Sequence, residues 1–242
     1  MKKGTFKGLL FREFYIARKN YGYNLLAYFV MVIICLLALL SYKCGNLHRY
    51  EHLMPPILKD YIDAMIKYIP AYTGAFFFGG ASDATPNDEK LPWRRFRIAS
   101  PVTPFRLSLA KYVCLFLTLM ISFSLTFAWL GLHSFLTATP LSTTDIAITM
   151  TIYTLSVLMI IYMQNICIWV RTLERTIIVL TISVHAVLLP VLFKNPELMT
   201  PDGLNKLEDF CVLLIPFTPL IIPAAFVLGY FFTTILYGRR EK

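Results

Sequence analysis

The chain has 242 residues, of which 57% are hydrophobic and only 15% are charged, and its mean hydropathy is +0.62. A soluble domain carries about 25% charged residues, so this composition excludes an ordinary soluble enzyme, a disordered chain and a disulfide-rich secreted domain. The net charge of +9 first raises the question of membrane topology, because basic residues gather on the cytoplasmic side of membrane proteins.

Six stretches are apolar and long enough to cross a bilayer, which takes about 20 residues in a helix. In chain order they cover residues 23–42, 66–84, 107–133, 146–170, 177–193 and 211–237. The second is the weakest of the six, because charged residues lie along its approach: Lys59, Asp60, Asp63 and Lys67. We therefore expect an all-α, polytopic membrane protein with six transmembrane helices, in which residues 1–242 form one transmembrane domain.

The first 20 residues are expected to form an interfacial elbow helix before the first span. Phe6, Leu9, Leu10 and Phe14 have helical spacing within a basic segment, which is typical of a helix lying in the membrane interface. Charged residues interrupt the segment, so it has no apolar core of the kind that a signal peptide needs. Two roles stay open for it: an anchor for the first span, or an anchor that also docks a cytoplasmic partner.

The basic residues predict which side of the membrane the termini occupy. With six spans, 17 of the 23 Lys and Arg residues fall on the side of the termini, which places both termini in the cytoplasm. Most of the positive charge is then explained by topology, and no nucleic-acid partner is expected.

Three prolines interrupt the last apolar stretch. Pro216, Pro219 and Pro223 each remove a helical hydrogen bond, so a straight helix is not expected there. We expect residues 194–218 to form external segments that re-enter the membrane, and the continuous span to begin near Pro219. A kinked helix is the alternative.

Motifs for catalysis or energy supply are absent from the sequence or fail on context. Gly74 and Gly79 have the spacing of a P-loop, but Gly-Ala follows where Lys-Ser or Lys-Thr is required. The segment from His48 to His52 reads H-x-x-E-H, an inverted zinc-protease pattern, but it lies in a short external loop without a third ligand. The chain is therefore expected not to be an enzyme, and ATP, if used, must bind another chain.

Few polar or thiol groups lie within the spans. Gln164 and Asn165 are expected to form interhelical hydrogen bonds, and His185 either packs against a neighbour or lines a cavity. Cys44 and Cys211 both map near the external surface, where a disulfide is one alternative.

The cytoplasmic loop of residues 85–106 has the most distinctive sequence. An acidic start is followed by Trp93 and Phe96, which lie one helical turn apart, and then by a basic stretch and a proline turn. A short helix with aromatic side chains on one face suits docking into the groove of a partner, or attachment to the lipid surface.

This loop resembles the one between the second and third helices of type-2 ABC exporter permeases. It is similar in particular to that of the small Firmicute permeases that export phenol-soluble modulins and other peptides. The matching positions follow the pattern D-E-x-x-x-W-x-x-[YF]-x-x-x-x-P-V-[ST], with K-Y further on: Asp88, Glu89, Trp93, Phe96, Pro101, Val102, Thr103, Lys111 and Tyr112. The sequence departs from the family where a basic residue usually follows P-V-S, because Pro104 stands there and Arg106 comes two positions later.

The resemblance implies that the loop is a coupling helix bound to a separate ATPase subunit, which would carry the ATP and Mg²⁺. The residues that would contact this ATPase lie between 88 and 103: Asp88, Glu89, Trp93, Arg94, Arg95, Phe96, Arg97, Pro101, Val102 and Thr103. The chain itself would hold no cofactor or metal. A second permease copy, identical or a close paralogue, would complete the exporter in a bacterial plasma membrane.

The expected cargo is an amphipathic or antimicrobial-type peptide. Four residues are candidates for lining its pathway: Tyr72, Phe76, Phe77 and His185. The aromatic residues among them fit helix packing equally well. The alternative function is a non-transporting scaffold or sensor partner of another membrane complex.

Overall fold

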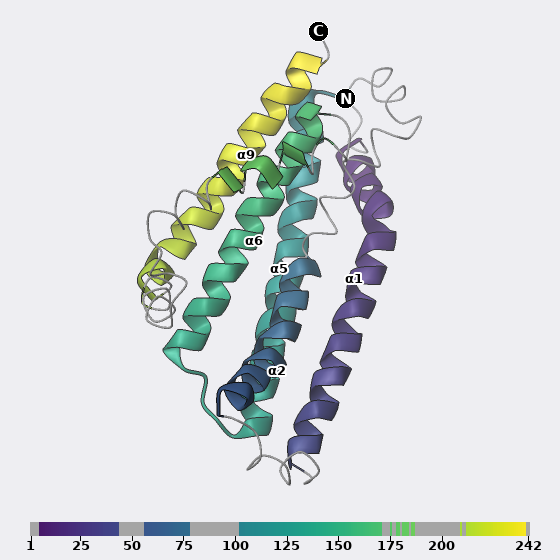
Figure 1. Ribbon diagram of the computed structural model, residues 1–242. Coiled ribbons are helices and arrows are strands. Elements are labelled where there is room, and N and C mark those ends of the chain that lie inside the picture. The colour runs from purple at the N-terminus through teal and green to yellow at the C-terminus, as the bar shows by residue number, and fades with distance from the viewer. Residues whose placement is uncertain are drawn as a thin grey trace.

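The computed structural model describes residues 5–43, 56–77, 102–170 and 212–240, together with a few residues between 175 and 186 and residue 209. These parts of the chain are helical and contain no strand. The elements are α1 (Thr5–Lys43), α2 (Pro56–Phe77), α5 (Pro104–Thr137), α6 (Thr143–Val170), the 3₁₀ turn η4 (Ile215–Phe217) and α9 (Thr218–Arg240). Figure 1 shows them as one elongated bundle.

Four helical segments in the described residues are long and apolar enough to cross a membrane. They are Phe6–Ser41, Pro104–Thr137, Thr143–Val170 and Val212–Arg239. These four confirm the first, third, fourth and sixth expected spans. The fifth expected span, residues 177–193, lies mostly outside the described residues. The fold is therefore that of an all-helical membrane protein.

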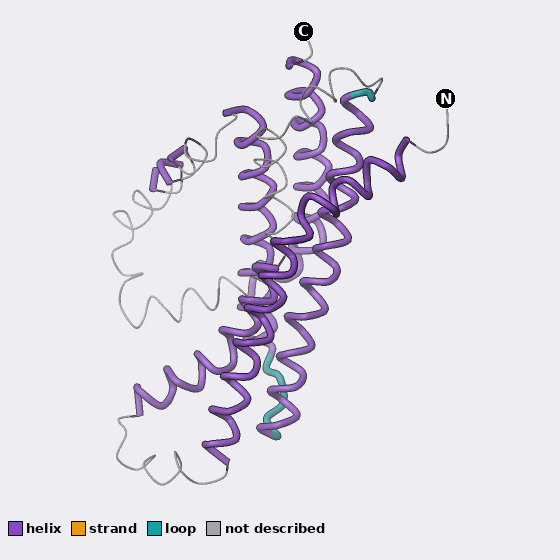
Figure 2. Tube along the Cα trace, turned by 90° about the vertical axis from the view of Figure 1, so that its right-hand side faces the viewer, coloured by secondary structure: helices purple, strands orange, loops and turns teal. Residues whose placement is uncertain are grey.

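The bundle has two ends that differ in what they contain. The start of α1 and the end of α9 lie at one end, which we call the terminal end (Figures 1 and 2). There Leu9 of α1 and Val102 pack against Leu107 of α5, Ile168 of α6 and Tyr237 of α9. The short loop from α5 to α6 lies at the opposite end, which we call the hairpin end.

The core lies along α5, which packs against every other long helix. At one face Tyr112, Leu115 and Leu119 of α5 meet Tyr153 and Val157 of α6 in a buried cluster. A second cluster joins α1, α2 and the hairpin half of α5: Cys35, Ile66, Ala71, Trp129 and Leu130. Since lipid is as apolar as these side chains, the clusters stabilise the bundle through close packing rather than through removal from water.

The outward faces of the described helices carry large apolar side chains that are exposed. On α1 alone these include Phe29, Ile33, Leu37 and Leu40. In a soluble protein such a continuous apolar surface would promote aggregation, whereas in a membrane it faces the lipid tails.

The elbow helix expected over residues 1–20 is not present as a separate element. Residues 5–43 form one continuous helix of 39 residues, α1. At 1.5 Å per residue it is about 58 Å long, well beyond the ~30 Å hydrocarbon core. Glu13 and Ala17 in its first half are buried. The N-terminal segment therefore packs along the bundle.

The second expected span needs a correction at its start. Its helix, α2, begins at Pro56 rather than at residue 66, and among the described residues it is not apolar enough to qualify as a span. The charged residues that weakened the prediction lie within the helix. Near the described end of α2, the Ser122 hydroxyl donates to the Gly74 carbonyl at 2.7 Å, which places Gly74 beside the middle of α5.

The prolines of the last apolar stretch change the helix only locally. Residues 212–214 are α-helical, η4 follows with Pro216 inside it, and α9 begins at Thr218. The α-helix α9 thus begins next to Pro219, but the apolar helical segment that is long enough to span runs from Val212 to Arg239 through η4, as in the kinked-helix alternative. Pro223 lies inside α9. Most of the expected re-entrant region, residues 194–218, lies outside the described residues. Its described end is helix and 3₁₀ turn.

The connection from α5 to α6 is a tight turn. Ala138 ends α5 in the left-handed conformation, with φ 55°. The Ser134 hydroxyl donates to the Thr139 carbonyl at 2.6 Å. Ser142 and Asp145 then cap α6 reciprocally, since each side chain accepts a 3.0 Å hydrogen bond from the other's backbone N–H. The turn therefore satisfies many of its own polar groups.

Candidate functional site

The segment expected to couple the chain to an ATPase falls mainly outside the described residues. Eight of its ten candidate residues lie there: Asp88, Glu89, Trp93, Arg94, Arg95, Phe96, Arg97 and Pro101. The structure describes the last two, Val102 and Thr103, which lead directly into α5. The C-terminal end of this segment therefore joins the bundle at the start of α5.

The junction between this segment and α5 explains the proline that departs from the family pattern. Thr103 has extended backbone angles and is the N-cap of α5. Its carbonyl accepts hydrogen bonds from the backbone N–H groups of Arg106 and Leu107, at 3.0 and 3.2 Å. Pro104 occupies the first helical turn, where its fixed φ is favourable and its missing N–H costs nothing.

The junction is packed against several helices. Val102 belongs to the cluster at the terminal end, in which Leu107, Ile168 and Tyr237 are buried. These side chains come from α5, α6 and α9, and Leu9 of α1 packs on them. A displacement of the segment before Val102 would therefore act on the ends of four helices at once.

A buried ion pair lies one step further into the bundle. Lys111 Nζ of α5 is 3.0 Å from Glu13 Oε2 of α1, and each side chain is only 3% exposed. Arg12 lies 3.4 Å from the other carboxylate oxygen of Glu13. Sequence reasoning missed this pair. The spacing in the sequence could have indicated that Glu13 is buried. It stands four residues from both Leu9 and Ala17, so in a helix it lies on the same packed face as these two residues.

Two further polar contacts join α1 to α5 on the same line. The Tyr21 hydroxyl lies 2.9 Å from Thr118 Oγ1, and the Tyr28 hydroxyl donates to the Leu125 carbonyl at 2.9 Å. The three contacts join residues that are 98, 97 and 97 positions apart in sequence. The two helices therefore run parallel in one fixed register.

A polar network joins α5, α6 and α9 inside the bundle. Thr233 Oγ1 donates to Asn165 Oδ1 at 2.8 Å and lies 3.3 Å from the Tyr112 hydroxyl, to which Asn165 Nδ2 donates at 3.5 Å. The expected interhelical role of Asn165 is thus confirmed. Gln164 is buried, but its Oε1 has no hydrogen-bond partner among the described residues, so its expected role is not seen at that atom.

A second charged cluster lies toward the hairpin end. Lys67 of α2 forms an ion pair with Asp145 of α6 at 2.5 Å, and the Tyr68 hydroxyl donates to the same carboxylate at 2.7 Å. The Trp129 indole N–H of α5 donates to the Lys67 carbonyl at 2.9 Å. Residues from α5 and α6 thus contact two consecutive residues of α2, Lys67 and Tyr68. The charge of Lys67 is neutralised within the bundle by Asp145.

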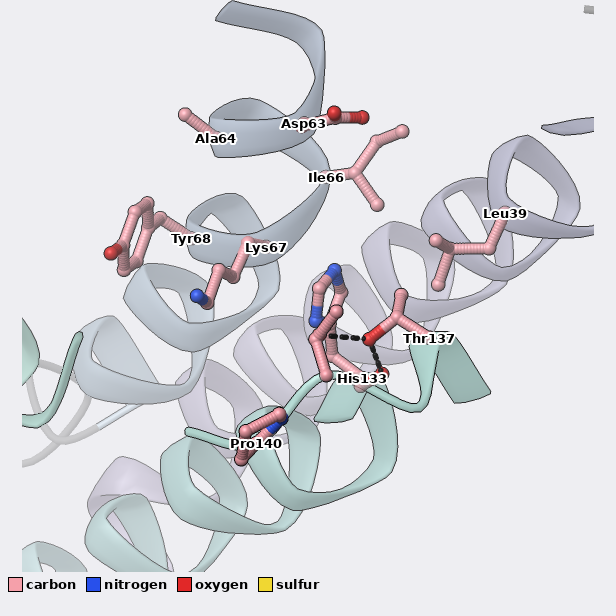
Figure 3. A pocket seen from close by; sticks show the side chains of 10 residues that line it. Leu39, Asp63, Ala64, Ile66, Lys67, Tyr68, His133, Thr137 and Pro140 are labelled. Carbon is pink, nitrogen blue, oxygen red and sulfur yellow. Dashed lines mark hydrogen bonds between the residues drawn. The ribbon is translucent and has the colours of Figure 1, made fainter. Parts of the chain in front are cut away.

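A pocket of about 540 Å³ opens beside this cluster (Figure 3). Polar and apolar side chains from α1, α2, α5 and the following turn line it, among them Leu39, Asp63, Lys67, His133 and Pro140. Its size is that of a small-molecule site, and its mixed lining suits a ligand with both polar and apolar parts.

Of the four expected pathway residues, the structure describes the side chains of Tyr72 and His185. Tyr72 stacks on Tyr68, with ring centroids 6.0 Å apart. Phe76 and Phe77 belong to α2, but their side chains lie outside the description. His185 is exposed, and its Nδ1 lies 2.8 Å from the Thr181 carbonyl.

The described residues offer no site for a metal. They contain no group of three His, Cys, Asp or Glu side chains able to bind one. Cys35, Cys114 and Cys167 are buried cysteines outside any disulfide, whereas Cys44 and Cys211, the expected candidates for a disulfide, lie outside the described residues.

Comparison with known proteins adds no family to these observations. No protein-family model, curated protein or solved structure matches the chain. The fold and the four apolar helices identify the chain as a helical membrane protein.

Proposed function

We propose that this chain is the transmembrane subunit of an ABC exporter that moves amphipathic peptides out of a bacterial cell. A separate ATPase subunit binds the loop of residues 88–105, and a second permease copy completes the transporter. The observation that carries the proposal is the position of Val102, which ends this loop and packs among the ends of α1, α5, α6 and α9.

The argument rests on how work can enter a membrane domain. A helix inside the bilayer cannot contact a soluble ATPase, so the work of ATP hydrolysis has to pass through a cytoplasmic loop. The loop before α5 offers two aromatic side chains one turn apart, Trp93 and Phe96, as anchors for a partner's groove. Three arginines at 94, 95 and 97 supply a charged rim around them.

The same-end position of the termini supports the proposed topology. Leu9 near the start of α1 and Tyr237 near the end of α9 belong to one cluster. With 17 of 23 basic residues on that side, the terminal end faces the cytoplasm in a plasma membrane. The loop would then lie where an ATPase can reach it.

In the proposed exporter, ATP hydrolysis takes place in the separate ATPase subunit. The sequence has no P-loop, so ATP and Mg²⁺ would bind the partner subunit. The pocket beside Lys67 and His133 lies toward the hairpin end, which is the outer end in this topology, and its mixed lining fits part of an amphipathic peptide.

The experiment that tests the proposal is co-purification of the ATPase in detergent with the double variant Trp93→Ala/Phe96→Ala. Buried aromatic anchors commonly cost about 2 kcal/mol or more each when truncated, so binding should weaken by well over tenfold. Phe135→Ala is the matched control, because Phe135 is an exposed aromatic residue of α5 at the hairpin end. Full binding by the double variant would reject the coupling role.

A wild-type chain that binds no ATPase would reject the exporter altogether. The scaffold or sensor alternative would then be the better account. Reversing the charges of Arg94 and Arg95 should have a smaller, salt-dependent effect, since charges at the rim of an interface are screened by solvent.

A further inference from the structure

We propose that Glu13 and Lys111 form a positioning pair that passes movement of the coupling loop from α5 into α1. The inference rests on the proposed function and adds the route that the movement takes. It concerns residues that contact neither ATP nor the cargo in that proposal.

The first step is the position of the pair. Lys111 stands seven residues after Pro104, so it lies about 10 Å along α5 from the point where the loop ends. Its partner Glu13 lies in the first half of α1. The pair is therefore close behind the junction at Val102, and on the path from that junction to α1.

The second step is the register between the two helices. From the ion pair toward the hairpin end, Tyr21 contacts Thr118 and Tyr28 contacts Leu125. Successive contacts are separated by about two helical turns on both helices. Sliding α1 along α5 by one turn would break all three contacts together. Directional contacts of this kind make the two helices move as one unit.

The third step is the electrostatics of the pair. Burying two charges costs desolvation free energy, and well-packed apolar residues of similar size often stabilise a protein as well or better. The pair is therefore poorly explained as a source of stability. Its distinct property is that it joins α1 to α5 in one register, because a separated buried charge would lack compensation. Arg12, which also lies near Glu13, belongs to α1 itself and sets no register between the helices.

The fourth step is the behaviour of α1 at the other end. Toward the hairpin end Cys35 of α1 packs with Ile66 and Ala71 of α2 and with Trp129 of α5, through apolar contacts. Apolar contacts are non-directional, so they fix the register less strictly. The two ends of α1 thus differ, with directional contacts nearest the loop.

The test compares two double variants in vesicles that contain the permease and its ATPase. Glu13→Leu/Lys111→Met replaces the pair by apolar side chains, and Glu13→Lys/Lys111→Glu exchanges the charges. A synthetic amphipathic helical peptide serves as cargo. The measurements are ATPase binding, thermal unfolding, ATP hydrolysis and peptide transported per ATP. Arg18→Gln is the control, because Arg18 lies over the exposed Tyr15 ring at 4.0 Å and not in the pair.

The apolar variant should bind the ATPase and unfold like wild type, but transport at least tenfold less peptide per ATP. The exchanged variant should regain most of that loss, and Arg18→Gln should match wild type. A purely structural pair would leave transport per ATP unchanged in the apolar variant, and that result would overturn the inference.

Two other outcomes are also decisive. If the apolar variant fails to fold, the exchanged variant decides, because a folded protein with restored charges but lost coupling contradicts a positioning role. If the wild type binds no ATPase, the proposed function fails and this inference fails with it. Normal coupling in both wild type and apolar variant would overturn the inference alone.

Discussion

Lys67 of α2 and Asp145 of α6 form an ion pair at 2.5 Å, and this pair joins to the bundle a long helix that is not among the candidate spans. The Tyr68 hydroxyl and the backbone N–H of Ser142 bind the same carboxylate. Asp145 thus caps α6 and neutralises a lysine at once. This double role explains why α2 can carry charges on its packed side.

The first prediction concerns this carboxylate. Asp145→Asn removes the charge opposite Lys67 and leaves one acceptor oxygen for Tyr68 and Ser142, which donate to different oxygens of the carboxylate. Hydrogen bonds to charged groups contribute about 1.5–3 kcal/mol, so the free energy of unfolding should fall by roughly that amount. Urea unfolding in detergent followed by circular dichroism measures it. Thr143→Ala, at an exposed neighbouring position, should change little, and an Asn variant as stable as wild type would contradict the assignment.

The second prediction concerns the network of Tyr112, Asn165 and Thr233. Thr233→Val removes the donor to Asn165 while keeping the shape of the side chain. Interhelical hydrogen bonds in membranes contribute on average about 0.6 kcal/mol, with a maximum of about 1.7, and the loss of stability should fall in this range. The control is Thr234→Val, whose hydroxyl donates only to the Tyr230 carbonyl within α9. Equal effects at both positions would reject a special role for the network.

The third prediction concerns a close approach of α9 to α5 and α6. A Cβ atom at Gly229 would lie 2.5 Å from both Ile161 Cγ2 and the Tyr112 hydroxyl oxygen, so Gly229→Ala should force the helices apart. Overpacking of this kind costs typically about 1–3 kcal/mol, measurable as a lower unfolding temperature. Gly238→Ala is matched in type and helix but has open space around it, and should have no such effect.

The fourth prediction tests the orientation of the bundle. In a variant whose five cysteines are replaced by alanine, single cysteines are placed at Ala64 and Arg239, which are exposed near opposite ends. A membrane-impermeant maleimide should label Ala64→Cys in intact cells. It should label Arg239→Cys only after permeabilisation. Labelling of Arg239→Cys in intact cells would reverse the topology.

The spans could be predicted because their signal is local. A run of apolar side chains of sufficient length needs no knowledge of its neighbours, and this is why α5, α6 and α9 appear where the composition placed them. The start of α9 beside Pro219 could be predicted for the same reason, because a proline affects only the helical turn in which it lies. The start of α2 was wrong because its charged residues read as a loop, whereas Lys67 is neutralised by a residue of another helix.

The contacts that organise the candidate site were not predictable in this way. Glu13 and Lys111 are 98 positions apart. In the sequence alone, Glu13 is one charge within a basic segment, and Lys111 is a lysine near the start of a span. Only the packing of α1 along α5 brings them together. An interhelical hydrogen bond was predicted for Asn165, but its donor Thr233 was not, since threonine is common in apolar helices.

The tight turn after Ala138 has a consequence for how the chain enters the membrane. Because only residues 138–142 separate α5 from α6, the two helices can partition into the bilayer as one preformed hairpin. The hydroxyls of Ser134, Thr137 and Ser142 form hydrogen bonds within this region. These hydrogen bonds lower the free-energy cost of moving the turn through the lipid.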